Sequence, residues 1–91
     1  MVLHLVQRSP FQHSALRDCL NLCADTDAIL LMEDGVLGVN HTDLKTVTVP
    51  LYALQDDLSA RGLSAPDTIR ACGYDEFVEL CGQYKQVVSW F

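Results

Sequence analysis

The chain has 91 residues and a mass of 10.1 kDa, which predicts one small domain over residues 1–91. Six Lys and Arg residues against twelve Asp and Glu residues give a net charge of −6. This acidic balance argues against direct nucleic-acid binding, which needs a basic face, and against attachment to a membrane surface. The apolar fraction of 49% excludes a disordered chain.

Neither a membrane span nor an export signal is visible in the sequence. No apolar run reaches the roughly 18–20 residues that a spanning helix needs. In the opening MVLHLVQR the basic residue follows the apolar stretch and no small-residue cleavage site appears, unlike in a signal peptide. We therefore expect a cytoplasmic protein whose cysteines are reduced.

The first third of the chain predicts a strand, a helix and a second strand. Val2–Val6 and Asp27–Met32 are short apolar runs, typical of buried strands. Ser9–Gln12 joins a capping serine, a proline suited to the first helical position and a glutamine that can close a capping box. We expect the first helix to begin there and to end near Ala24. Its apolar stripe consists of Leu16, Cys19, Leu20 and Cys23.

The middle of the chain leaves alternatives open. After the break at Glu33–Gly35, the segment Val36–Asn40 is compatible with a hairpin or with a helical turn. His41–Lys45 is polar and predicts a surface loop, and the conformation over residues 36–49 is not settled.

The last half predicts three strands and two helices. Val47–Leu54 is rich in strand formers, and Pro50, which cannot donate to a ladder, places the strand core at Leu51–Leu54. Asp56–Gly62 is a short helix that stops at its glycine. Thr68–Cys72 is a fourth strand. A third helix carries Phe77, Leu80, Cys81 and Tyr84, and a last strand covers Val87–Phe91.

This alternation predicts an α/β fold, a single small domain with a mainly parallel sheet of about five strands and helices on both faces. Functional groups of such sheets gather at the carboxyl ends of the strands, here near residues 7–9, 33–35, 55–56 and 72–73.

The four cysteines are the main candidates for a chemical role, and no two of them stand at C-x-x-C spacing. Cys19 is either a persulfide-carrying thiolate or a small core residue, and its place in the apolar stripe favours the core. Cys23 and Cys81 share the core interpretation, whereas Cys72 ends a strand. A metal site of His13, Cys19 and Cys23 lacks a fourth donor, so no metal is expected. No phosphate-binding loop or nucleophile elbow is present, so no cofactor is expected.

The chain ends on two large aromatic residues, Trp90 and Phe91. Leaving both in water would expose apolar area worth roughly 25 cal/mol per Å². We expect them to dock, either on the chain's own core or on another subunit, and both alternatives stay open.

Short motifs follow one another along the whole chain: Leu3-His4, Ser9-Pro10-Phe11, Glu33-Asp34-Gly35-Val36, Tyr52-Ala53-Leu54, Asp57-Leu58, Ala60-Arg61-Gly62, Phe77-Val78 with Leu80, and Trp90-Phe91. In this order they resemble the TusB/DsrH family. The chain departs from familiar members between Asn40 and Val49. The resemblance implies the DsrE/DsrF/DsrH-like fold and membership of a heterohexamer of three related subunits, two copies each.

The resemblance further implies a sulfur-relay role with TusC/DsrF-like and TusD/DsrE-like partners and a TusE/DsrC-like acceptor reached through the complex. One branch passes persulfide sulfur towards 2-thiouridine at the tRNA wobble position, and the other serves dissimilatory sulfur oxidation. The chain is then mainly a structural, non-catalytic subunit. DsrH-like members have a cysteine on the first helix that matches Cys19, so the alternative is a sulfurtransferase subunit with Cys19 as its persulfide carrier.

Two further expectations complete the hypotheses. A small ligand-binding module without a sulfur role would have an apolar pocket at the strand ends. Whether an isolated chain self-associates through its partner surface is an alternative that the sequence leaves open.

Overall fold

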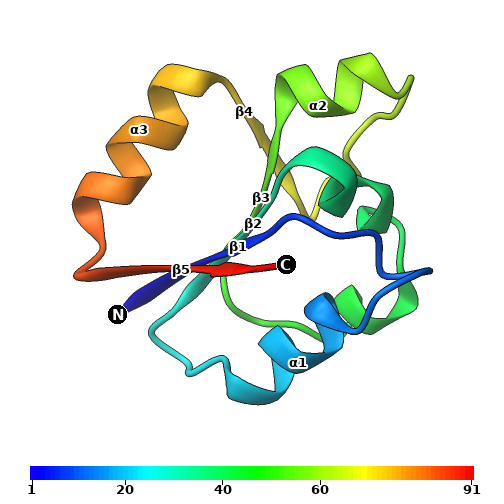
Figure 1. The fold of residues 1–91 in the computed structure, drawn as a ribbon. Coiled ribbons are helices and arrows are strands. Elements are labelled where there is room, and N and C mark those ends of the chain that lie inside the picture. The colour runs from blue at the N-terminus through cyan, green and yellow to red at the C-terminus, as the bar shows by residue number, and fades with distance from the viewer.

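A computed structural model describes every residue from Met1 to Phe91. Its centre is a five-stranded sheet in the order β4-β3-β2-β1-β5, and every pair of neighbouring strands is parallel (Figure 1). The strands are β1 (Val2–Val6), β2 (Ala28–Leu31), β3 (Leu51–Leu54), β4 (Arg70–Cys72) and β5 (Gln86–Trp90). The parallel sheet confirms the predicted fold class.

Helices cover both faces of this sheet, as expected. On one side lie α1 (Ala15–Leu22), the 3₁₀ helices η1 (Glu33–Gly38) and η2 (Thr42–Leu44), and α2 (Gln55–Ala60). On the other side lies α3 (Tyr74–Gln83) alone. Because β5 lies next to β1, the chain from β4 through α3 crosses the whole sheet, and β5 becomes an edge strand.

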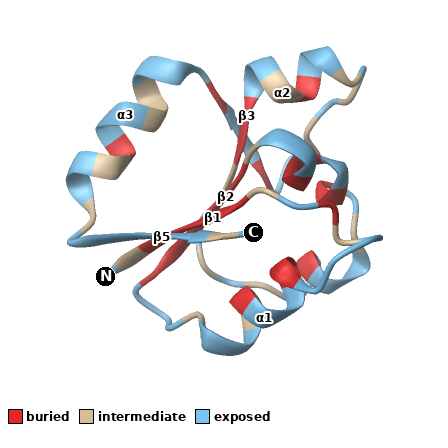
Figure 2. Cartoon of the chain, viewed as in Figure 1, coloured by how far each residue is buried: buried red, intermediate tan, exposed pale blue.

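The sheet divides the buried apolar residues into two clusters (Figure 2). The side chains of β1 alternate between them: Leu3 and Leu5 face α3, and Val6 faces α1. Strand β2 is buried along its whole length, which is why its sequence is apolar throughout instead of alternating. The α1 side holds 13 of the clustered residues and the α3 side holds 7, and Leu80 is the only buried residue of α3, so α3 is the more lightly anchored layer.

The first helix begins later than the sequence predicts. The Ser9 side chain does act as a cap, but it caps a turn: its Oγ accepts the Phe11 N–H at 3.2 Å, and its carbonyl accepts the His13 N–H at 3.0 Å. Helix α1 starts only at Ala15. The predicted start at residues 9–12 is wrong because the bond that caps a helix also closes a local turn.

Of the two alternatives for Val36–Asn40, the structure has the helical turn, because η1 occupies most of this segment. The surface loop predicted for His41–Lys45 is wrong in part, since η2 forms there and Leu44 is buried. Gly35 lets η1 lie against the end of β1: a Cβ added to Gly35 would overlap the Val6 carbonyl.

The other predicted elements are confirmed with small changes at their ends. Pro50 immediately precedes β3, and Gly62, with φ +65°, follows α2 as its stop. None of the helices combines the length and the apolar character that crossing a membrane requires.

The close backbone contact at Gly35 predicts that adding one methyl group at this position destabilises the fold. Gly35→Ala should lower the free energy of unfolding by about 2–3 kcal/mol, because the backbone of η1 or β1 has to move. Gly82→Ala is the matched control: its Cβ meets nothing within 4 Å, and alanine favours a helix over glycine by up to about 1 kcal/mol. Urea unfolding measures both, and a Gly35→Ala variant as stable as the parent would contradict the close approach.

Candidate functional site

A buried carboxylate, Asp27, joins the start of β2 to β1 and to the turn after α1. Its Oδ1 accepts the Val2 N–H at 2.9 Å, and its Oδ2 lies 2.9 Å from both the Ala24 nitrogen and His4 Nε2. The side chain is 5% exposed. Donation from the Ala24 N–H, with further bonds from His4 and Val2, outweighs desolvation and lowers the Asp27 pKa to about 2. Asp27 is therefore ionised at neutral pH.

The indole of Trp90 determines the tautomer of His4. Trp90 Nε1 is a donor only, and it lies 3.0 Å from His4 Nδ1. His4 Nδ1 must therefore accept, which leaves the ring proton on Nε2, where it is donated to Asp27. A chain of two hydrogen bonds thus runs from β5 through β1 to the residue before β2.

Cys23 stands beside this chain of bonds. One ligand atom each of His4, Cys23 and Asp27 lies within 4.8 Å of the others. The donor set does not suit a metal ion. Metal-bound histidines usually donate their second N–H, whereas the second nitrogen of His4 accepts from an indole, and Asp27 already accepts three N–H groups. The cluster is better described as a hydrogen-bonded network.

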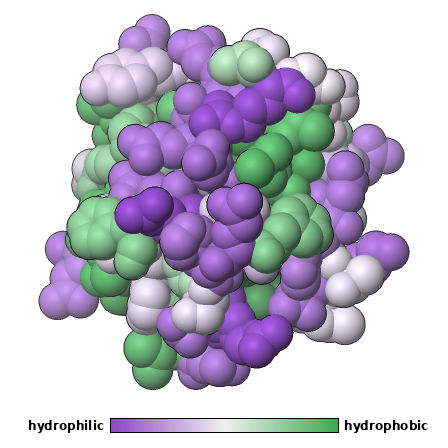
Figure 3. All heavy atoms as spheres, turned by 45° about the vertical axis from the view of Figure 1, so that its right-hand side comes forward, coloured by the Kyte–Doolittle hydropathy of each residue, from purple (hydrophilic) through white to green (hydrophobic).

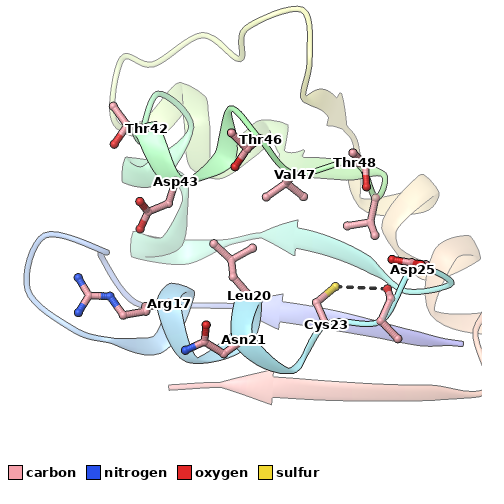
Figure 4. Close-up of a pocket in the computed structure, with 12 residues that line it drawn as sticks. Arg17, Leu20, Asn21, Cys23, Asp25, Thr42, Asp43, Thr46, Val47 and Thr48 are labelled. Atoms are coloured by element: carbon pink, nitrogen blue, oxygen red, sulfur yellow. Dashed lines mark hydrogen bonds between the residues drawn. The ribbon is translucent and has the colours of Figure 1, made fainter.

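Cys23 also lines a cavity of about 610 Å³ between α1 and the segment that leads to β3 (Figure 4). The lining is mixed, with three threonine hydroxyls, an amide, one cation and two acids among apolar groups. Its residues are Arg17, Leu20, Asn21, Cys23, Ala24, Asp25, Thr42, Asp43, Thr46, Val47, Thr48 and Val49. The cavity lies beside the residues that precede β2 and β3, at the amino ends of these strands. The largest cavity is therefore not the apolar pocket at the carboxyl ends that a ligand-binding module predicts.

The electrostatics of this cavity hold Cys23 in the thiol form. Its Sγ donates to the Ala24 carbonyl at 3.7 Å, the bond drawn in Figure 4. Burial raises the pKa of Cys23, and the negative charges of Asp27 and Asp25 raise it further. Reactive cysteines occupy electropositive surroundings, whereas the charges that act on the Cys23 thiol are negative.

The structure places the predicted site residue Cys19 in the core. Its side chain is 0% exposed, and burial, followed by the nearby Cys23 and Asp27, raises its pKa to about 12. Cys72 is buried at the end of β4, and Cys81 is half-buried on α3; burial raises the pKa of both thiols. Persulfide carriage by Cys19 stays a prediction.

The carboxyl ends of the strands, where the sequence places functional groups, carry a structural ion-pair network instead. Arg61 at the end of α2 lies 2.8 Å from Asp34 of η1, and Asp57 accepts the Glu33 N–H at 2.6 Å. These contacts attach α2 to η1. They also hold Glu33 at φ 51°, a conformation that residues other than glycine rarely adopt.

Sequence reasoning missed the link between His4, Asp27 and Trp90. The three residues are far apart in the chain, and the parallel register that sets Leu3 beside Ala28 and His4 beside Val88 brings them together. One signal was present: a histidine inside an apolar strand and an aspartate directly before another are both polar groups that need buried partners.

Comparisons with known proteins agree over nearly the whole chain. A family model described as DsrH like protein matches residues 8–87. Protein TusB of Serratia proteamaculans (strain 568) is 42% identical, with 98% of this chain and 100% of that protein covered. Protein TusB of Buchnera aphidicola subsp. Baizongia pistaciae is 31% identical with the same coverage.

Two solved structures have a similar fold. The ychN protein of E. coli superposes with a TM-score of 0.76 at 16% identity, covering 98% of this chain and 97% of that one. Tm0979 of Thermotoga maritima has a TM-score of 0.69 at 28% identity, with 93% and 95% covered. Identity as low as 16% shows the fold alone.

The lowered pKa of Asp27 makes stability depend on pH in a definite direction. Because the folded-state pKa lies near 2 and the ordinary value is 3.8, the carboxylate stabilises the fold above about pH 4, and this stabilisation is lost as the pH falls towards 2. Asp27→Asn should therefore lose about 2 kcal/mol at pH 7 and less at pH 2.5. Asp25→Asn, at an exposed carboxylate, is the control. An equal loss for Asp27→Asn at both pH values in urea unfolding would refute the assignment.

Proposed function

This chain belongs to the TusB/DsrH family, and we propose that it is a subunit of a heterohexameric sulfur-relay complex. In this proposal it docks onto TusC/DsrF-like and TusD/DsrE-like subunits and acts mainly through its surface. The complex passes persulfide sulfur to a TusE/DsrC-like acceptor, towards 2-thiouridine at the tRNA wobble position. The TusB names of the relatives favour this branch over dissimilatory sulfur oxidation.

The observation that carries the proposal is the unprotected edge strand β5. It pairs with β1 on one side and with no strand on the other, so backbone N–H and C=O groups face outward. Isolated proteins usually guard such an edge with charges or proline, whereas β5 reads Gln-Val-Val-Ser-Trp. Val87 and Val88 are 42% and 38% exposed. An edge of this kind fits a partner chain.

Of the two terminal aromatic residues, one docks on its own chain and the other is left exposed for another subunit. Trp90 is half-buried against its own chain and bonded to His4, whereas Phe91 is 80% exposed. Figure 3 shows other apolar side chains between hydrophilic ones on the face turned forward there. Exposed aromatic anchors beside an apolar edge are typical of subunit interfaces, so Phe91 is proposed to dock on a sister subunit.

The thiols support a structural role. Burial raises the pKa of all four cysteines, and the attacking species in sulfur transfer is the thiolate. The reactive thiol of the relay is therefore proposed to lie on a sister subunit. The net charge of −6 fits a chain that contacts proteins and does not itself bind RNA.

Co-purification tests the docking proposal. Tagged wild-type chain, co-expressed with TusC- and TusD-like chains, should retain both partners, and Val87→Lys combined with Phe91→Ser should weaken retention at least tenfold, on the order of 1.4 kcal/mol. Leu22→Lys, an exposed apolar position on α1, is the control and should bind normally. A wild-type chain that stays monomeric with both partners present would reject the proposal.

Persulfide carriage by Cys19 is the competing function, and mass spectrometry separates it from the structural role. After incubation of the isolated chain with a persulfide donor, we expect no adduct of about +32 Da on Cys19, because its thiol is buried and protonated. The half-buried Cys23 should react before Cys19. Relay activity should survive Cys19→Ser. A Cys19 adduct together with loss of relay in Cys19→Ser would establish the carrier instead.

A further inference from the structure

We propose that Trp90, His4 and Asp27 form a proton-controlled latch on the C-terminal edge strand: when His4 takes up one proton, the Trp90 side chain is released from β1. The latch rests on the hydrogen-bond geometry of the isolated chain. Its consequence for partner docking rests, in addition, on the proposed function.

The geometry allows the Trp90 bond in only one charge state of His4. With Trp90 Nε1 3.0 Å from Nδ1 and Asp27 Oδ2 2.9 Å from Nε2, the neutral ring accepts on one side and donates on the other. The His4 residue is 4% exposed, so water does not readily replace either partner. Both nitrogens are satisfied only while Nδ1 has no proton.

Protonation of His4 removes its hydrogen bond with Trp90 and keeps its hydrogen bond with Asp27. A proton from water binds Nδ1, and the imidazolium then has two N–H groups. The Nε2–H stays with the Asp27 carboxylate, now as an ion pair, while the new Nδ1–H points at the indole N–H, which is also a donor. The Trp90 side chain must turn away to find another acceptor. No covalent bond between heavy atoms forms or breaks.

Few charged groups surround His4. Asp27, before β2, is its only ion-pair partner, and Cys23, after α1, is the other titratable group in the cluster. From β5 the neighbours are Val88, beside His4 in the register, and Trp90 itself. Asp27 stays ionised between pH 8 and pH 5. The thiols of Cys19 and Cys23 and the hydroxyl of Tyr84, which also sense the Asp27 charge, have raised pKa values and keep their protons. His4 is therefore the group of this network that is left to take up a proton.

The effect is confined to the end of β5. Its backbone remains paired with β1, and the Gln7 N–H still donates to the Trp90 carbonyl at 3.2 Å. What changes is the direction of the indole and the hold on Phe91, the residue that follows. Acid therefore alters the apolar end of the edge strand and leaves the sheet intact.

Nuclear magnetic resonance of the full isolated chain tests the latch, because the chain has a single tryptophan and hence one indole N–H signal. From pH 8 to pH 5 this signal should move, and its hydrogen exchange, corrected for the intrinsic pH dependence, should become at least tenfold faster, while the Gln7 amide stays protected. In His4→Gln, whose amide donates and accepts without titrating, the indole signal should not move. His41→Gln, at a histidine outside this network, should behave like wild type.

A second variant keeps the proposal testable if His4→Gln fails to fold. Trp90→Phe keeps an aromatic ring and removes the indole donor. Relative to wild type, it should lose stability at pH 8, where the indole bond forms, and lose less at pH 5, where wild type has released that bond as well. An equal loss of stability in Trp90→Phe at both pH values, a transition that persists in His4→Gln, or an indole signal that does not respond to pH would each overturn the latch. None of these measurements uses a partner, so failure of the docking proposal leaves their outcome unaffected.

Discussion

One carboxylate, that of Asp27, holds four segments of this small fold together. It accepts N–H groups from the first residue of β1 and from the residues after α1, and through His4 it reaches the indole of β5. Each bond would be of modest worth at the surface, but a buried anion with three donors is strongly stabilised over one with fewer. The order of the strands around β1 makes this convergence possible, because β1 lies between β2 and β5.

The two faces of the sheet are covered unequally, and β5 lies at an unpaired edge between them. The α1 side receives a helix, two 3₁₀ turns and α2, whereas the α3 side receives one helix that contributes a single buried residue. The last crossover carries the chain across the α3 face to β5, which pairs with β1 on one side and with no strand on the other. The edge at β5 is apolar and unpaired, and it is the place at which the proposed partner docks.

The elements that the sequence predicts well are those whose signal is local. Apolar runs specify β1 and β2, and Gly62 marks the end of α2, because burial and backbone conformation act on those residues directly. The start of α1 and the segment around Leu44 are decided by competing turns, and local patterns of Ser, Pro and Asp fit both outcomes. The site is less predictable still: His4, Asp27 and Trp90 meet only through strand register, which no spacing in the sequence encodes.

The same anion that stabilises the fold also suppresses the nearby thiols. Asp27 raises the pKa of both Cys19 and Cys23, in addition to the effect of burial. To make either thiol a good nucleophile, the chain would have to lose the charge that joins its segments or receive a cation from outside. Stability and thiolate chemistry therefore compete at this end of the sheet. In the proposed relay, a chain built around such an anion therefore acts through the surfaces that it offers to other subunits.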